Sequence, residues 1–117
     1  MTHVSQLRAA YDDALKEVDV LITPLTPRVA MKHPELIMSV KDKMTPAIGL
    51  SLNTCPFNCT GHPGLAMPIG WGNAEDGVGK LPVAMQIVGK RFGEAEIFKA
   101  AAAWEAGGLG LDSWDGK

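Results

Sequence analysis

Residues 53–70 read Asn-Thr-Cys-Pro-Phe-Asn-Cys-Thr-Gly-His-Pro-Gly-Leu-Ala-Met-Pro-Ile-Gly, turn-rich first and apolar second. The apolar half, Gly64 to Ile69, predicts a strand. Pro68 indicates the end of that strand or an edge position, because proline has no amide hydrogen to donate to a sheet. Residues 70–80 contain four glycines and predict a surface loop. Leu81 to Val88 predicts a second strand, which we expect to pair antiparallel with the first.

The N-terminal third predicts a helix followed by a strand. Apolar residues recur at steps of three and four from Val4 to Val18, so they form one stripe of an amphipathic helix. Thr2 is a suitable N-cap for this helix. The compact apolar run from Val18 to Thr23 predicts a short buried strand that Pro24 closes.

Two helices are expected in residues 28–52, where the apolar spacing is irregular. Pro34 suits the first turn of a helix over Glu35 to Lys43, and Pro46 suits the start of another over Ala47 to Leu52. Near the C-terminus, Glu94 to Glu105 predicts a helix with an apolar stripe, and two glycines follow it directly. The remaining residues, 109–117, have no period and predict a flexible tail.

Length and composition limit the class of protein. The chain has 117 residues, 46% hydrophobic and 21% charged, which suits one small globular domain. A net charge of −2 predicts no nucleic-acid partner. No apolar run approaches the roughly 18 residues that cross a bilayer, so we expect no membrane association. Two cysteines cannot build a disulfide framework, and we expect a cytoplasmic protein.

Candidate catalytic groups are few. Ser51 stands two residues after Gly49, as in half of a nucleophile elbow, but the second glycine is missing. Cys55, Cys59 and His62 are spaced like part of a zinc site with His33 as a distant fourth ligand, although the second closely spaced ligand pair is absent. The same cysteines lack a nearby basic residue to activate a thiolate. We therefore expect no catalytic residue, no metal and no cofactor.

Four ordered motifs resemble the amidase-signature hydrolases, over about Tyr11 to Glu105. Residues 53–70 resemble the C-terminal motif of this family, and the Phe-Asn-x-Thr-Gly-His-Pro form is most similar to the aliphatic amidases and acetamidases. Asp19 to Pro24 resembles the Asp-x-Leu-x-x-Pro strand of the family. Lys80 to Gly89 resembles its Gly-Leu-Pro-x-Gly-x-Gln-x-x-Gly strand, with Lys80 and Ala84 where glycine is usual. The predicted helix that ends at Glu105 resembles its closing helix.

The resemblance implies the C-terminal portion of an α/β/α amidase fold, with two to three strands and flanking helices. It makes residues 1–108 a partial domain. Catalysis in the family resembles a Ser–cis-Ser–Lys triad, and no Gly-Gly-Ser-Ser-like stretch of that kind occurs here. By resemblance, the part of the substrate-pocket wall that this chain supplies is Asn58, Thr60, Gly61 and His62. From local chemistry alone, the same residues are expected to stabilise the turn, with Gly61 at positive φ and His62 hydrogen-bonded nearby.

The leading hypothesis is therefore an amidase fragment that is inactive alone. Its partner would be an N-terminal amidase portion or a second copy of the chain, because the apolar strands need cover on both faces. An alternative hypothesis is a non-catalytic binding or assembly module that keeps the fold and self-associates. A small metal or thiol site at Cys55, Cys59 and His62 is a third.

Overall fold

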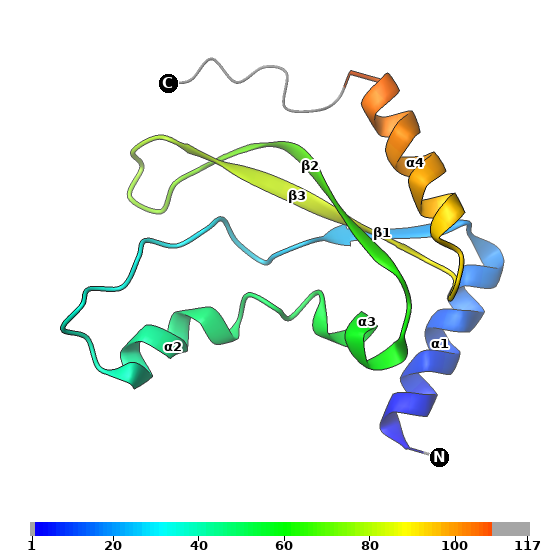
Figure 1. Ribbon diagram of the computed structural model, residues 1–117, viewed down its shortest axis with the longest axis horizontal. Helices are drawn as coiled ribbons and strands as arrows, with labels where there is room; N and C mark the ends of the chain where they lie inside the picture. The colour runs from blue at the N-terminus through cyan, green and yellow to red at the C-terminus, as the bar shows by residue number, and fades with distance from the viewer. Residues whose placement is uncertain (1, 109–117) are drawn as a thin grey trace.

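A computed structural model describes residues 2–108 and shows a mixed α/β fold with one three-stranded antiparallel sheet (Figure 1). The strand order is β1-β3-β2, so the last strand in the sequence lies in the middle. The prediction of two to three strands with flanking helices is confirmed. The elements are α1 (His3–Glu17), β1 (Val20–Pro24), α2 (Val40–Ile48), α3 (Cys55–Thr60), β2 (Gly64–Asn73), β3 (Lys80–Gly89) and α4 (Glu94–Ala106).

The antiparallel pair of β2 and β3 is confirmed, but both strands are longer than the sequence predicts. Gly64 pairs with Val88 at one end and Asn73 with Lys80 at the other, so the expected loop over residues 70–80 is wrong for its first four residues. The register shifts after Pro68, and this bulge lets the strand continue beyond the proline. Pro68 does lie on an edge strand, as expected.

The first strand is an edge strand and not a buried one. β1 begins at Val20, two residues later than expected, and pairs only with β3 among the described residues. The side chain of Ile22 is 62% exposed, because it projects from a face of the sheet that the described residues do not cover at this position. The prediction of a buried strand from Val18 to Thr23 is thus wrong in its start and its burial.

The core lies between α4 and one face of the sheet. Ile97 and Ala101 of the helix pack on Met67, Met85 and Ile87 of the two long strands. The predicted helix and its stop are confirmed, with Gly107 as the C-cap residue. The opposite face is partly covered by the segment before α3. The side chain of Gln86 lies on this opposite face, because successive side chains of a strand alternate between the two faces. It donates a hydrogen bond of 3.2 Å to the backbone oxygen of Asn53.

The predicted helices over residues 35–43 and 47–52 are replaced by one helix, α2. Ser39 caps it by accepting a hydrogen bond from the backbone N–H of Asp42, and Pro46 lies inside it. The short α3 occupies residues that the sequence suggests are turns. At the N-terminus, the cap of α1 is confirmed, because the Thr2 hydroxyl accepts from the backbone N–H of Ser5 at 3.3 Å. The predicted tail over 109–117 lies outside the described residues.

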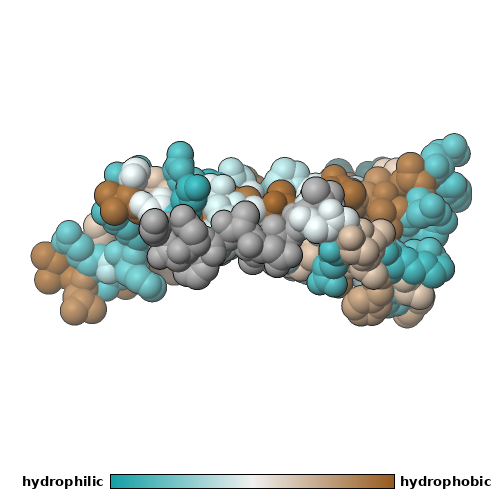
Figure 2. Space-filling view, turned by 90° about the horizontal axis from the view of Figure 1, so that it is seen from above, coloured by the Kyte–Doolittle hydropathy of each residue, from teal (hydrophilic) through white to brown (hydrophobic). Residues whose placement is uncertain are grey.

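The molecule is a thin, open slab rather than a sphere (Figure 2). Its extents are 46 × 40 × 16 Å, and its radius of gyration is 17.0 Å. A compact domain of this length has a radius of gyration of about 13 Å. The chain exposes 8226 Å², about a third more than the roughly 6100 Å² expected of a compact monomer of its mass. Hydrophobic residues lie on the surface at both ends of the slab in Figure 2.

Candidate functional site

The junction between α3 and β2 carries the four residues expected to form a pocket wall. Thr60 ends the helix, and Gly61 follows with φ of 77°, a left-handed conformation that glycine adopts without strain. The backbone N–H of Gly61 donates to the oxygen of Phe57 at 2.8 Å, which closes the helix. Thr60 and His62 are buried, whereas Asn58 and Gly61 are exposed. The turn therefore divides the four residues into two buried and two exposed ones.

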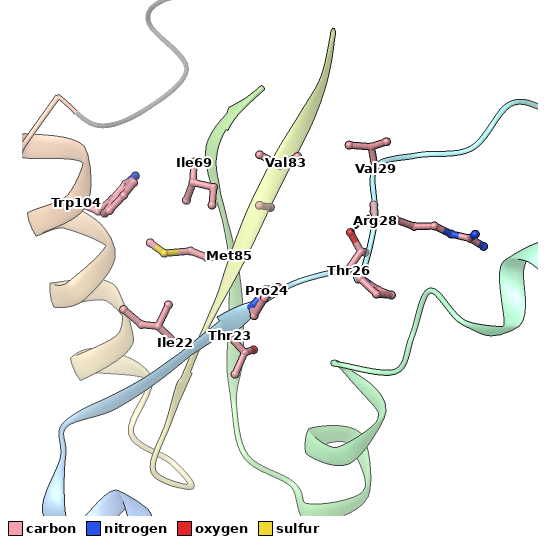
Figure 3. Close-up of a pocket in the computed structure, with 12 residues that line it drawn as sticks. Ile22, Thr23, Pro24, Thr26, Arg28, Val29, Ile69, Val83, Met85 and Trp104 are labelled. Atoms are coloured by element: carbon pink, nitrogen blue, oxygen red, sulfur yellow. Dashed lines mark hydrogen bonds between the residues drawn. The ribbon is translucent and has the colours of Figure 1, made fainter. Parts of the chain in front are cut away.

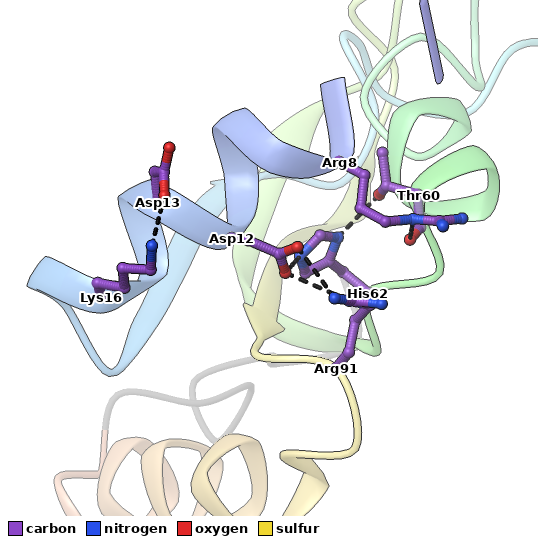
Figure 4. Close-up of polar contacts among 7 residues, drawn as sticks. All are labelled: Arg8, Asp12, Asp13, Lys16, Thr60, His62 and Arg91. Carbon is purple, nitrogen blue, oxygen red and sulfur yellow. Dashed lines mark hydrogen bonds and ion pairs between the residues drawn. The ribbon is translucent and has the colours of Figure 1, made fainter. Parts of the chain in front are cut away.

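The imidazole of His62 is held from both sides (Figure 4). Its Nδ1 lies 2.8 Å from the hydroxyl oxygen of Thr60, and its Nε2 lies 3.3 Å from a carboxylate oxygen of Asp12 on α1. The contact of Nε2 with Asp12 is a charge contact, because Nε2 makes no hydrogen bond within the described residues. The hydrogen bond of the ring is the one between Nδ1 and the Thr60 hydroxyl. The local hydrogen bond expected for His62 is confirmed.

Two arginines complete the cluster. Arg91, after β3, donates to both carboxylate oxygens of Asp12 at 3.2 and 3.0 Å, the two-pronged geometry that suits a guanidinium. These bonds hold the pKa of Asp12 below its ordinary value of 3.8, and nearby His62 adds to the effect while burial opposes it. Arg8 donates to the backbone oxygen of Thr60 at 2.9 Å. The ring of Tyr11 packs against Phe57 and His62.

Sequence reasoning missed the three charged members of this cluster. Arg8 and Asp12 are four residues apart on the predicted helix, which places them on one face and is the local signal for them. Arg91 is 79 residues from Asp12 in the chain, and nothing local connects the two. The cluster joins α1, the turn after α3 and the end of β3.

The order carboxylate, imidazole, hydroxyl resembles the arrangement of a catalytic triad, but the chemistry differs. A nucleophilic hydroxyl must reach a substrate carbonyl, and the Thr60 residue is 0% exposed. Both ring nitrogens of His62 already face groups of the fold. The contacts of the cluster therefore hold the turn in place, and we call this cluster the lock. Asn58 and Gly61 lie beside it and are exposed.

The other sequence candidates do not come together. Cys55 and Cys59 are free and exposed, whereas the His62 side chain is buried. Among residues 2–108, no three His, Cys, Asp or Glu side chains are grouped as metal ligands. No helix in this range is long and apolar enough to cross a bilayer. Ser51 lies in an exposed turn before α3.

A cleft of about 500 Å³ lies beside α4, over the outer end of β1 (Figure 3). Trp104 lines one side, residues 26–29 line the other, and Met85 and Val83 form the floor. The indole N–H of Trp104 is buried and has no hydrogen-bond partner among the described residues. None of the four expected wall residues lines this cleft.

Comparison with known proteins relates this chain to amidases. The family model for amidases matches residues 1–98. An enantioselective amidase of Rhodococcus rhodochrous is 38% identical over 102 residues, which are 87% of this chain and 19% of that protein. A glutamyl-tRNA(Gln) amidotransferase subunit from Lacticaseibacillus casei is 35% identical over 99 residues, which are 82% of this chain and 18% of that protein.

The chain spans only a part of the curated relatives it matches, from 17% to 46% of their length. Among solved structures, 6-aminohexanoate cyclic dimer hydrolase in complex with its substrate superposes with a TM-score of 0.59 at 22% identity. The superposition covers 95% of this chain and 23% of the hydrolase, so nearly the whole slab corresponds to about a quarter of a larger fold. By the family match over residues 1–98, the chain belongs to the amidase family.

Proposed function

We propose that this chain is the C-terminal part of a Ser–cis-Ser–Lys amide hydrolase and is inactive alone. The observation that carries the proposal is its share of the relatives, because 87% of the chain matches only 19% of an enantioselective amidase. The other four-fifths would supply the nucleophile, the base and the oxyanion donors that acyl transfer requires. The hydroxyls of Ser5 and Ser39 are engaged in hydrogen bonds at helix starts, which supports the lack of an activated serine at these two positions.

We further propose that Asn58, Thr60, Gly61 and His62 form part of the substrate-pocket wall in the complete enzyme. The two exposed residues, Asn58 and Gly61, would face the substrate. Thr60 and His62 would act from behind as positioning residues, since both are held in the cluster with Asp12. The free, exposed cysteines suit a reducing compartment, and we propose a cytoplasmic location.

A chimera tests the proposal directly. The segment of the R. rhodochrous amidase that matches this chain is replaced by this chain, and hydrolysis of acetamide and propionamide is measured alongside the parent enzyme. We expect ammonia release from the chimera and none from the isolated chain. Ammonia release by the isolated chain would show that it carries its own nucleophile. A folded parent beside a chimera that does not fold would argue against the scaffold role.

The alternative is a non-catalytic module that self-associates through the same fold. The observation in its favour is the exposed apolar surface, since Ile22, Val40 and Ile48 are 62%, 78% and 69% exposed. Sedimentation of the isolated chain at several concentrations distinguishes the two. A tight dimer that melts cooperatively favours the module, and a monomer removes it.

A further inference from the structure

Helix α2 exposes its apolar side chains to solvent. Val40, Met44 and Ile48 follow one another at steps of four residues within the helix and therefore form one stripe. Their exposed fractions are 78%, 54% and 69%. In a helix of a complete domain such a stripe faces the core, whereas here it faces solvent.

The polar side of the same helix faces the chain itself. Asp42, Lys43 and Pro46 line a groove of about 350 Å³ against residues 28–34. Arg28 donates a hydrogen bond to the backbone oxygen of Pro46 at 2.5 Å, which fastens the helix to that segment. No other helix or strand packs extensively on α2 within residues 2–108. The helix, which we call the arm, lies below the extended segment that follows β1 and away from the sheet (Figure 1).

The helix itself is well formed despite its exposure. Ser39 caps its first turn twice, because its hydroxyl accepts from the backbone N–H of Asp42 at 3.2 Å and donates to the Asp42 carboxylate at 2.7 Å. Lys43 donates to the backbone oxygen of Leu36 at 3.0 Å and holds the entry to the helix. The apolar stripe is thus presented in a fixed direction, as in helices that bind a groove in a partner.

We infer that α2 is a docking helix whose stripe packs into an apolar groove of the remaining amidase polypeptide. The inference rests on the proposed function and names the surface through which the fragment is held. Two observations select this occupant. Nearly all of the chain superposes on 23% of a larger hydrolase, so this part belongs to a much longer polypeptide there. The chain also exposes 8226 Å², an excess over a compact monomer that is larger than the roughly 800 Å² that one partner buries in a standard interface.

Cysteine accessibility tests the inference in the chimera and in the isolated chain. Met44→Cys places a thiol on the stripe. Thr45→Cys, its neighbour about 100° around the helix, serves as the matched control. Alkylation by a maleimide is read by mass spectrometry of the peptide that contains the new cysteine. We expect Met44→Cys to react at least about tenfold more slowly in the chimera than in the isolated chain. Thr45→Cys should react at similar rates in both.

The outcomes separate this inference from the proposed function. An active chimera in which Met44→Cys reacts as fast as in the isolated chain overturns the docking helix and leaves the proposed function standing. An isolated chain whose Met44→Cys becomes protected as its concentration rises shows that a second copy covers the stripe, which also overturns the inference. As a second variant, Met44→Glu should lower the Tm of the chimera and leave that of the isolated chain unchanged. Equal effects on both would contradict the inference.

Discussion

The cluster around His62 and the arm formed by α2 lie in one short chain but treat their side chains in opposite ways. At the cluster, polar groups from three distant segments are paired, and the His62 side chain at its centre is 0% exposed. On the arm, apolar groups from one segment are exposed, and Val40 is 78% exposed. The first region holds charged and polar groups against one another, whereas the second leaves its apolar side chains in solvent. A partial domain can therefore keep a turn that is held by polar contacts and still leave apolar side chains exposed.

The largest effect is expected from shortening a side chain in the core, with a matched shortening on the arm as the control. Ile87→Ala removes a side chain that is 1% exposed and packs between the long strands and α4. We expect it to lower the free energy of unfolding by about 2–5 kcal/mol. Ile48→Ala, at 69% exposure, should change it by less than about 0.5 kcal/mol in the isolated chain. Urea unfolding of both variants measures the difference, and equal losses would mean that the arm is already buried.

The next test removes one hydroxyl from the cluster. Thr60→Val keeps the shape of a fully buried residue and leaves Nδ1 of His62 without its partner. Because a buried polar atom is then unsatisfied, we expect a loss of about 1–3 kcal/mol in the free energy of unfolding. Thr45→Val is the control, since the exposed hydroxyl of Thr45 bonds to the backbone of Lys41 on the arm. An unchanged free energy of unfolding in Thr60→Val would show that the hydrogen bond between Thr60 and His62 does not stabilise the turn.

Replacing two glycines by alanine is expected to change the stability in opposite directions, by smaller amounts. Gly61 has φ of 77°, so Gly61→Ala should cost about 1–2 kcal/mol through left-handed strain. Gly49, which caps α2 with φ of −78°, has no neighbouring atom where a methyl group would sit. Gly49→Ala should therefore stabilise the chain by up to about 1 kcal/mol. Thermal melting of the pair checks the signs, and the same sign for both would contradict this assignment of backbone conformations.

The smallest expected effect is a dependence of stability on acid. Arg91 holds the pKa of Asp12 below 3.8 in the folded chain, so the unfolded chain binds its proton first as the pH falls. This contribution is fully present above pH 3.8 and is lost as the pH falls through the lowered pKa. Asp12→Asn should flatten the stability profile in that window relative to the parent. Identical acid profiles for the two proteins would show that the carboxylate is not paired in solution.

The sequence is sufficient to predict an element whose start, end and apolar stripe are set by neighbouring residues. α4 follows the predicted helix because its apolar stripe is regular and Gly107 stops it. Positive φ at Gly61 and the local bond of His62 also follow from neighbours in the sequence. In the middle of the chain, two prolines suggest two helix starts, yet Ser39 provides the cap of a single helix and Pro46 is accommodated inside it. The Ser-x-x-Asp spacing is the local signal that favours one start at Ser39 over two starts at the prolines.

Tertiary contacts account for the rest. The sequence motif identifies Thr60 and His62, but their partners Arg8, Asp12 and Arg91 meet them only because three elements converge. The exposure of β1 also does not follow from its residues, since an apolar run is compatible with a central strand and with an edge strand that lacks its neighbour. What covers a strand is a property of the whole polypeptide, and this chain matches about a fifth of an amidase.

The bulge after Pro68 has a consequence for the behaviour of the chain in concentrated solution. β2 is an edge strand, and exposed edges invite stacking of one molecule on another into ordered aggregates. Proline offers no amide to an incoming strand, and the shifted register that follows it interrupts the row of backbone groups. The β2 edge is thus a poor template for ordered stacking, so we expect the addition of a strand at this edge to be disfavoured.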